Sequence, residues 1–215
     1  YKAQKPQLKV MVTGCLAERY KEEIRKEIPE VDAVLGIGSN GAIAALVARV
    51  AQSEAFESYG AKTAMPLGGK RVISTPRHFA YLKIAEGCSN ACHYCAIPLI
   101  RGPLRSRPLE QVLAEARWLA GEGVQELIVI AQDITAYGAD LGEVQIAQLL
   151  DGLNAIDGIR WIRLLYAYPE RITPQFIAAM TSNEKVLHYL DVPIQHSETR
   201  VLKAMNRKGT RETVT

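Results

Sequence analysis

The stretch Ala80-Tyr-Leu-Lys-Ile-Ala-Glu-Gly-Cys88-Ser-Asn-Ala-Cys92-His-Tyr-Cys95 joins an apolar run to three closely spaced cysteines. Residues 80–85 are apolar and rich in β-forming side chains, so they predict a buried strand that ends in the cysteine loop. The chain has only four cysteines, too few for a disulfide framework. Three thiols at this spacing therefore indicate a metal or redox centre in a reducing compartment.

Helices and strands alternate after the cysteine loop. Pro108 opens a helix that Gly121 and Gly123 close. Strands are expected at 126–131, 161–167 and 187–194, and helices at 144–156, after the N-cap Thr173 and after the N-cap Ser197. Four successive βα units with right-handed crossovers are typical of a partial (β/α) barrel.

The chemistry of such barrels sits where the strands end, at the C-terminal face. Gln132 and Asp133 follow one predicted strand, and Gln195 and His196 follow another. We therefore expect these side chains to converge with the cysteine loop. Polar residues that merely terminate the strand are the alternative for Gln132 and Asp133, and a helix-entry residue is the alternative for His196.

The N-terminal part predicts a separate α/β block. Strands are expected at 8–13 and 31–37 and helices at 18–28 and 41–52, a βαβα arrangement typical of a parallel, flavodoxin-like sheet. Glycine and proline interrupt the pattern afterwards, so we divide the chain into domains at 1–55 and 79–215, with a linker at 56–78 that has room for a short hairpin.

The sequence Gly36-Ile-Gly38-Ser-Asn-Gly41 fits a dinucleotide-binding fingerprint by spacing alone. No clear third strand ends in the acidic residue that this fingerprint requires about 20 positions later. A glycine-rich turn with a helix cap is therefore the better interpretation.

Composition excludes several classes of protein. Hydrophobic residues make up 48% of the 215 residues and charged residues 23%, so a packed core is expected rather than disorder. The net charge of +3 is too small to argue for nucleic-acid binding by itself. No apolar run approaches the ~18 residues that a membrane span needs. A cytoplasmic protein without a membrane partner is the expectation.

The number of cysteines bears on the kind of metal. Structural zinc sites use four ligands, and His93 is an awkward fourth because it is adjacent to Cys92. A disulfide would leave one thiol over. A cubane iron–sulfur cluster held by Cys88, Cys92 and Cys95, with one open iron, accounts better for three thiolates. A zinc-stabilised binding module and a ferredoxin-like electron carrier remain the alternatives from another class.

The order Cys-x-x-x-Cys-x-aromatic-Cys after a first strand resembles the signature of radical S-adenosylmethionine enzymes. This resemblance implies that the open iron of a 4Fe–4S cluster binds S-adenosylmethionine and that Tyr94 stacks on its adenine. It also implies cofactor-binding roles for Gln132, Asp133 and Gln195.

A closer resemblance covers nearly the whole chain and points to the methylthiotransferase family. Its motifs are Val12-Thr-Gly-Cys15-Leu-Ala, Ala80 to Cys88, Ile97-Pro, Ile100-Arg-Gly102, Ser106-Arg-Pro108, Ala131-Gln-Asp133, Ala136-Tyr-Gly138 with Asp140, and Leu190 to His196. Within the family they look like the RimO-like branch. The resemblance implies an enzyme, a sulfur-group transferase that methylthiolates the β-carbon of an aspartate in a small-subunit ribosomal protein. The sister MiaB-like branch, which acts on adenosine in transfer RNA, is the alternative.

The family implies two 4Fe–4S clusters, of which this chain carries one complete ligand set. Cys15 matches one of three family cysteines that hold the auxiliary, sulfur-donating cluster. The other two cysteines, the end of the barrel and the family's C-terminal RNA-binding-type domain have no counterpart here, so we expect a piece of a longer protein that is not fully active alone. The expected partners are the ribosomal protein or ribosome, a low-potential electron donor and, through the missing domain, RNA. Glu86, Arg101 and His196 receive no assigned role.

Overall fold

The computed structural model describes residues 2–52, 55–64, 66–69 and 71–214. The chain forms two compact units. One unit comprises Tyr1–Pro66 and Ala96–Gly102, and the other comprises Leu67–Cys95 and Pro103–Thr215. The short segment that directly follows Cys95 is thus part of the N-terminal unit, although the cysteine loop is part of the second unit.

A three-stranded parallel sheet forms the centre of the N-terminal unit. Its order is β1 (Met11–Thr13), β2 (Ala33–Leu35) and β3 (Phe56–Ser58), with Ala33 paired to both Met11 and Phe56. Because strand side chains alternate, Ala33 and Leu35 pack in one hydrophobic cluster and Val34 in another. The helices of this unit are α1 (Cys15–Arg19), α2 (Lys21–Glu27), α3 (Ile43–Ala51) and α4 (Ile97–Arg101), with short 3-10 helices η1 (Ile37–Ala42) and η2 (Lys62–Ala64).

The structure differs from the sequence expectations at two places in this unit. The predicted helix at 18–28 is divided at Tyr20, whose non-helical φ of −116° and ψ of 34° separates α1 from α2, and α1 already begins at Cys15. Strand β3 lies inside the stretch expected to be a linker and pairs parallel to β2 rather than forming a hairpin. A strand of three residues is too short to be recognised from an alternating pattern of apolar and polar residues. Residues 65 and 70 of that stretch lie outside the described residues.

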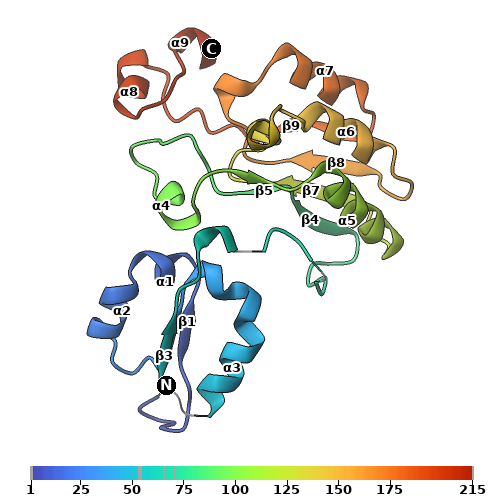
Figure 1. The fold of residues 1–215 in the computed structure, drawn as a ribbon. Helices are drawn as coiled ribbons and strands as arrows, with labels where there is room; N and C mark the ends of the chain where they lie inside the picture. The colour runs from blue at the N-terminus through green and yellow to red at the C-terminus, as the bar shows by residue number, and fades with distance from the viewer. Residues whose placement is uncertain (1, 53–54, 65, 70, 215) are drawn as a thin grey trace. The chain divides into compact units, whose positions relative to one another are not determined.

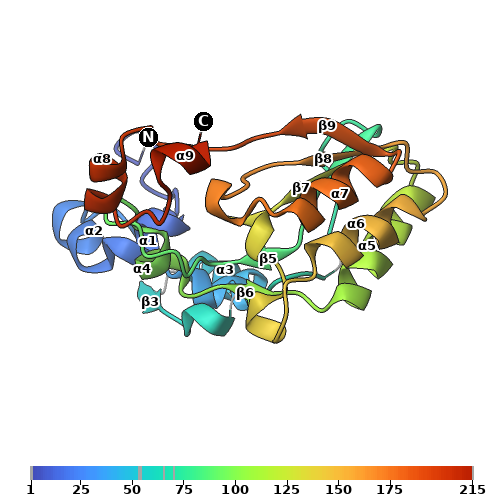
Figure 2. The same ribbon diagram turned by 90° about the horizontal axis from the view of Figure 1, so that it is seen from above.

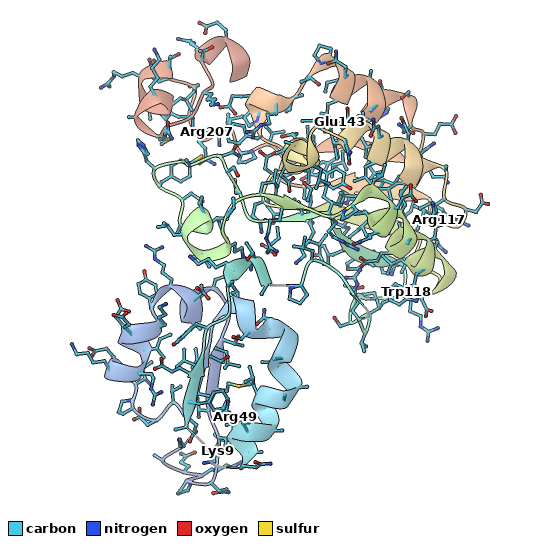
Figure 3. All side chains as sticks on the ribbon, in the orientation of Figure 1. Lys9, Arg49, Arg117, Trp118, Glu143 and Arg207 are labelled. Carbon is cyan, nitrogen blue, oxygen red and sulfur yellow. The ribbon has the colours of Figure 1, made fainter. Side chains whose placement is uncertain are left out.

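Close backbone contact explains the glycines near β2. A Cβ atom on Gly38 would lie 2.3 Å from the carbonyl oxygens of both Gly60 and Ala61. A side chain at Gly38 is therefore excluded by packing within this unit, which agrees with a glycine-rich turn. Arg49 of α3, labelled in Figure 3, lies over the Phe56 ring, with its guanidinium carbon 4.2 Å from the ring centroid.

The second unit contains a four-stranded parallel sheet in chain order (Figure 1). Its strands are β4 (Phe79–Lys83), β7 (Glu126–Ile130), β8 (Trp161–Leu164) and β9 (Val186–Leu190). Helices α5 (Leu109–Gly121), α6 (Ile146–Asn154) and α7 (Pro174–Ser182) follow successive strands and pack along the sheet (Figure 2). This arrangement confirms the predicted α/β fold with successive βα units of a partial barrel.

The core of this unit lies between the sheet and these helices. Fully buried side chains of the strands, such as Leu82, Leu127 and Ile162, face helical residues such as Leu119 and Leu149. Thr173 caps α7 as predicted, because its hydroxyl accepts a hydrogen bond from the Phe176 amide at 3.2 Å. At the later helix α8 (Thr199–Ala204) the N-cap is Glu198 and not the expected Ser197.

Short elements frame the C-terminal edge of the sheet. Strand β5 (Ala85–Glu86) continues from β4 and pairs antiparallel with β6 (Arg105–Ser106). The cysteine loop therefore begins directly after this two-stranded pair. The 3-10 helices η3 (Ile134–Ala136) and η4 (Ala139–Leu141) follow β7, and η5 (Pro169–Arg171) follows β8. The chain continues through α8 to α9 (Arg211–Val214).

Candidate active site

The cysteine loop leaves the sheet at Gly87, whose φ of +77° makes the turn. All three cysteines of the loop are free and partly buried. Burial raises the pKa of the Cys88 thiol, and the nearby Asp133, Cys95 and Cys92 raise it further. Three sulfur donors on one loop are chemically suited to binding a metal centre.

The thiols lie on one loop but do not enclose a common point. Among the described residues, no group of three or more histidine, cysteine, aspartate or glutamate side chains is arranged to hold a metal ion. The donor set therefore fits a metal cluster by its chemistry, and the thiol side chains have to turn towards a common point when such a cluster binds.

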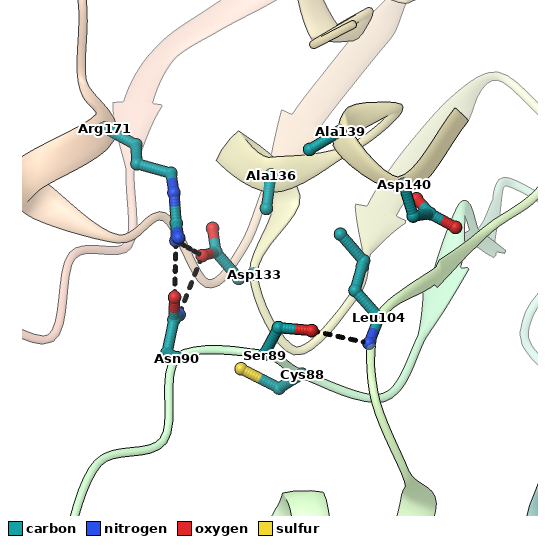
Figure 4. A pocket seen from close by; sticks show the side chains of 9 residues that line it. All are labelled: Cys88, Ser89, Asn90, Leu104, Asp133, Ala136, Ala139, Asp140 and Arg171. Atoms are coloured by element: carbon teal, nitrogen blue, oxygen red, sulfur yellow. Dashed lines mark hydrogen bonds and ion pairs between the residues drawn. The ribbon is translucent and has the colours of Figure 1, made fainter. Parts of the chain in front are cut away.

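One flank of the loop is attached to the end of β7. The amide nitrogen Nδ2 of Asn90 donates to Asp133 Oδ2 at 2.9 Å, and Arg171 Nη1 lies 2.5 Å from the same oxygen. Arg171 Nη1 also donates to Asn90 Oδ1 at 2.6 Å (Figure 4). A loop residue, a strand-end residue and a residue of η5 thus form one closed triangle of polar contacts.

The other flank is attached to the end of α8. Asn206 Nδ2 donates to the Ala91 carbonyl at 2.8 Å, and the His93 amide donates to the Met205 carbonyl at 3.1 Å. The His93 ring nitrogen Nδ1 lies 3.0 Å from the Ala204 carbonyl. His93 is thus held by α8 through Nδ1, and among the described residues it joins no group of side chains arranged to hold a metal ion.

A cavity of about 230 Å³ opens beside Cys88 (Figure 4). Its lining comes from the cysteine loop, from the turns after β7 and from η5: Cys88, Ser89, Asn90, Leu104, Asp133, Ala136, Ala139, Asp140 and Arg171. Asp140 has a structural contact as well, because its Oδ2 accepts from the Ser106 amide at 2.9 Å. The cavity is thus built by strand ends and loops at the edge of the sheet where sequence reasoning expected the site.

Gln132 occupies a buried polar cluster close to the loop. Its Nε2 donates to Glu86 Oε1 at 3.1 Å, and Glu86, which is fully buried, is paired with Lys83 Nζ at 3.0 Å. The Gln132 Oε1 atom is buried and has no hydrogen-bond partner among the described residues. It is an acceptor that a donor group of a bound cofactor would satisfy.

The remaining candidate residues are distributed differently. Tyr94 is 51% exposed on the loop, and Gln195 is exposed with a φ of +64°. His196 Nδ1 accepts from the Glu198 amide at 2.9 Å, a local contact at the entry to α8. Cys15 begins α1 in the N-terminal unit, where Arg101 Nη2 donates to its sulfur at 3.2 Å.

Two residues of the site escaped the sequence reasoning. Asn90 lies inside the cysteine motif, but spacing gave it no role, and Arg171 was not singled out. A signal was present for Arg171: it follows the end of β8, as Asp133 follows the end of β7. Polar residues just past each parallel strand end were the place to look.

The sequence profile of the radical SAM superfamily matches residues 82–215, which include the cysteine loop and the whole parallel sheet from Leu82 onward. The chain belongs to the radical SAM superfamily. Residues 1–36 of this radical SAM protein match uncharacterized protein family UPF0004. No helix in the described ranges combines the length and the apolar character that crossing a membrane requires.

Two similar sequences share one name. This radical SAM protein is 46% identical over 216 residues to a protein of Thermoanaerobacter sp., and 48% identical over 205 residues to one of Lachnoclostridium phytofermentans. Both relatives are named ribosomal protein uS12 methylthiotransferase RimO. The alignments cover 99% and 94% of this chain and 50% and 47% of the relatives. The resemblance to the methylthiotransferase family is thus confirmed, and the chain spans about half the length of the curated relatives it matches.

A solved structure is similar in fold. It is the radical S-adenosylmethionine methyltransferase TsrM from Kitasatospora setae with cobalamin and a [4Fe-4S] cluster bound. The TM-score is 0.52 at 16% sequence identity, over 67% of this chain and 31% of TsrM. At this identity the likeness concerns the fold alone, and it agrees with the partial barrel of βα units.

Proposed function

We propose that this chain carries the catalytic core of a methylthiotransferase that modifies an aspartate of ribosomal protein uS12. The observation that carries the proposal is the loop with three free cysteines at the C-terminal edge of the parallel sheet, in a chain that shares 46–48% identity with relatives named for that activity. Neither a zinc module nor an electron carrier accounts for both of these properties.

Cys88, Cys92 and Cys95 would hold a 4Fe–4S cluster with one open iron, and S-adenosylmethionine would bind there. When bound, this pair supplies the one-electron chemistry that removes a hydrogen atom from an unactivated carbon. The protein's own residues orient the cofactor and keep water away. The ring of Tyr94 would lie against the adenine, and the orphaned Oε1 of Gln132 would accept a hydrogen bond from the ammonium group.

Cys15 would contribute to a second, sulfur-donating cluster. It lies in the N-terminal unit at the first residue of α1, and Arg101 donates to its sulfur. Because Arg101 is engaged with Cys15, it is a poor candidate for pairing with the carboxylate of the substrate. Gln195 completes the residues that we expect to contact the cofactor.

The first experiment tests the cluster. Anaerobic reconstitution should give about four irons per chain, and S-adenosylmethionine should change the electron paramagnetic resonance spectrum of the reduced cluster. Alanine at Cys88, Cys92 or Cys95 should abolish both results, whereas Cys15→Ala is the matched control that keeps them. Bound zinc without iron, or a spectrum that does not change when S-adenosylmethionine is added, would show that the assignment of the three cysteines to an iron–sulfur cluster is wrong.

The second experiment tests the substrate. The full-length enzyme to which this chain belongs, reconstituted and given S-adenosylmethionine and a reductant, is offered a peptide that carries the ribosomal aspartate loop and, separately, unmodified transfer RNA. Mass spectrometry should find one added methylthio group on the peptide and none on the RNA. Modification of the RNA alone would show that the proposed substrate is wrong, whereas the proposed radical chemistry would still hold.

A further inference from the structure

The carboxylate of Asp133 is almost completely withdrawn from solvent. Its side chain is 3% exposed, and a buried charge of this kind is stable only when it is paired and hydrogen-bonded. Oδ1 accepts from the amide and the hydroxyl of Thr135, at 3.0 and 2.5 Å. Oδ2 accepts from Asn90 and Arg171.

A carboxylate offers about four acceptor positions, and protein donors occupy that number on Asp133. No acceptor position remains for the ammonium group of a cofactor, a role that the sequence had suggested for Asp133. One of the four donors, the side-chain amide of Asn90, belongs to the cysteine loop.

Asn90 lies midway between Cys88 and Cys92. Its amide group donates to Asp133 and accepts from Arg171, so both ends of the amide are held (Figure 4). An amide fixed at both ends can adopt only one orientation, and the backbone between the two cysteines is fixed with it. We call Asn90, Asp133 and Arg171 the loop bridge.

We propose that Asp133 and Arg171 are positioning residues, which hold the cysteine loop at the edge of the sheet through Asn90, and that Asp133 binds no ligand itself. The proposal rests on the proposed function only in that the loop carries the cluster. Its physical content is that the loop is ordered before any cluster binds.

Contacts of the neighbouring residues fix the segment that carries Arg171. The preceding residue, Glu170, accepts from the Gly209 amide at 3.0 Å and is paired with the buried Arg207 at 3.3 Å. The guanidinium groups of Arg171 and Arg207 both lie over the Tyr168 ring, 5.1 and 3.9 Å from its centroid. The connection between β8 and α7 is therefore a fixed support from which Arg171 reaches the loop.

The chain offers a matched control. Arg163 is paired with Glu126 at 2.7 Å, with side-chain exposures of 34% and 14%, compared with 36% and 3% for Arg171 and Asp133. Both pairs join a residue of β8 or of the connection that follows it to a residue of β7 or of the connection that follows it. Arg163 and Glu126 belong to the strands themselves, whereas Arg171 and Asp133 follow the strand ends at the cysteine loop.

The test is amide hydrogen exchange in the cluster-free protein. Arg171→Ala should speed exchange of residues 88–92 by about tenfold or more, because the loop loses two of the three contacts of the loop bridge. Arg163→Ala should leave that exchange unchanged. Exchange within β7 serves as the measure of the fold, so a variant that merely unfolds is recognised. Equal loop exchange in the wild type and in Arg171→Ala would overturn the proposal.

Two further variants distinguish positioning from ligand binding. Asn90→Ala combined with Arg171→Ala should change loop exchange no more than Asn90→Ala alone, because Asn90→Ala already removes both contacts by which the loop bridge holds the loop. Asp133→Asn should speed loop exchange, and in the reconstituted protein it should broaden the spectrum of the reduced cluster. If Asp133→Asn weakens S-adenosylmethionine binding while loop exchange stays normal, Asp133 is a ligand and the proposal is wrong. A wild-type protein that binds no cluster would contradict the proposed function, and the cluster-free exchange comparison would still decide the role of the loop bridge.

Discussion

Arg101 Nη2 donates a hydrogen bond to the sulfur of Cys15 across 3.2 Å, although 86 residues separate them in the chain. The contact joins helix α4 to the first residue of helix α1. Since α4 directly follows the segment that ends in Cys95, the contact connects the chain after the cysteine loop to the candidate ligand of a second cluster.

This contact should be measurable as a coupling energy. A double-mutant cycle of Cys15→Ala and Arg101→Ala, followed by urea unfolding of the cluster-free protein, should give about 0.5–1.5 kcal/mol of coupling, because a charged donor loses a specific acceptor. Arg19→Ala, at an exposed position of α1, is the control and should show no coupling with Cys15. Additive effects of Arg101→Ala and Cys15→Ala would mean that the contact does not form in solution.

Tyr94 should contribute to cofactor binding through its ring. Its side chain is 51% exposed, so substitution should cost little stability. Tyr94→Ala in the reconstituted protein should weaken S-adenosylmethionine binding about tenfold by calorimetry, since stacking on a base contributes about 1–3 kcal/mol. Tyr94→Phe keeps the ring and should bind nearly normally. Equal weakening in both variants would assign the effect to the hydroxyl.

The buried hydroxyl of Tyr137 should stabilise the fold. It donates to the Arg107 carbonyl at 2.8 Å, and burial raises the pKa of Tyr137 to about 12. Tyr137→Phe should lower the free energy of unfolding by about 1–2 kcal/mol at neutral pH, because a buried carbonyl loses its donor. Tyr189→Phe, at a half-exposed position, should have little effect.

The raised pKa also predicts alkaline behaviour. The wild type keeps the contribution of Tyr137 below pH 10 and should lose it as the pH rises towards 12, because the folded state binds the proton more tightly. Tyr137→Phe should lack this part of the loss. Denaturant unfolding measured across that range checks the difference between the two proteins.

Asp32 should stabilise the N-terminal unit against acid. Its pKa is lowered from 3.8 to about 2 by the hydrogen bond from Lys2, the hydrogen bond from the Val10 amide and the charges of Lys2 and Lys9. The contribution is therefore complete above about pH 4 and is lost as the pH falls towards 2. Asp32→Asn should unfold more easily at neutral pH, by about 1 kcal/mol after allowance for solvent screening. At pH 2 the two proteins should be equally stable, and a constant difference at every pH would contradict this cause.

Local patterns determined most of the secondary structure and the kind of site. Helical spacing and the cap at Thr173 identified α7, and apolar runs identified the strands of the second sheet. These features depend on residues a few positions apart, so the sequence displays them directly. The cysteine spacing after a strand likewise indicated the cluster loop, because Cys88, Cys92 and Cys95 are near neighbours along the chain.

Tertiary structure alone decided what the loop is attached to. Asn90 and Arg171 are 81 residues apart, and Asp133 lies 43 residues from Asn90, yet one triangle of contacts joins them. Such a contact depends on strand order and register, which bring the ends of β7 and β8 together at one edge of the sheet. Strand β3 was missed for the same reason: three residues become a strand only because β2 lies beside them to accept and donate hydrogen bonds. The sequence therefore determined which groups are available, and the folded sheet decided which of them meet.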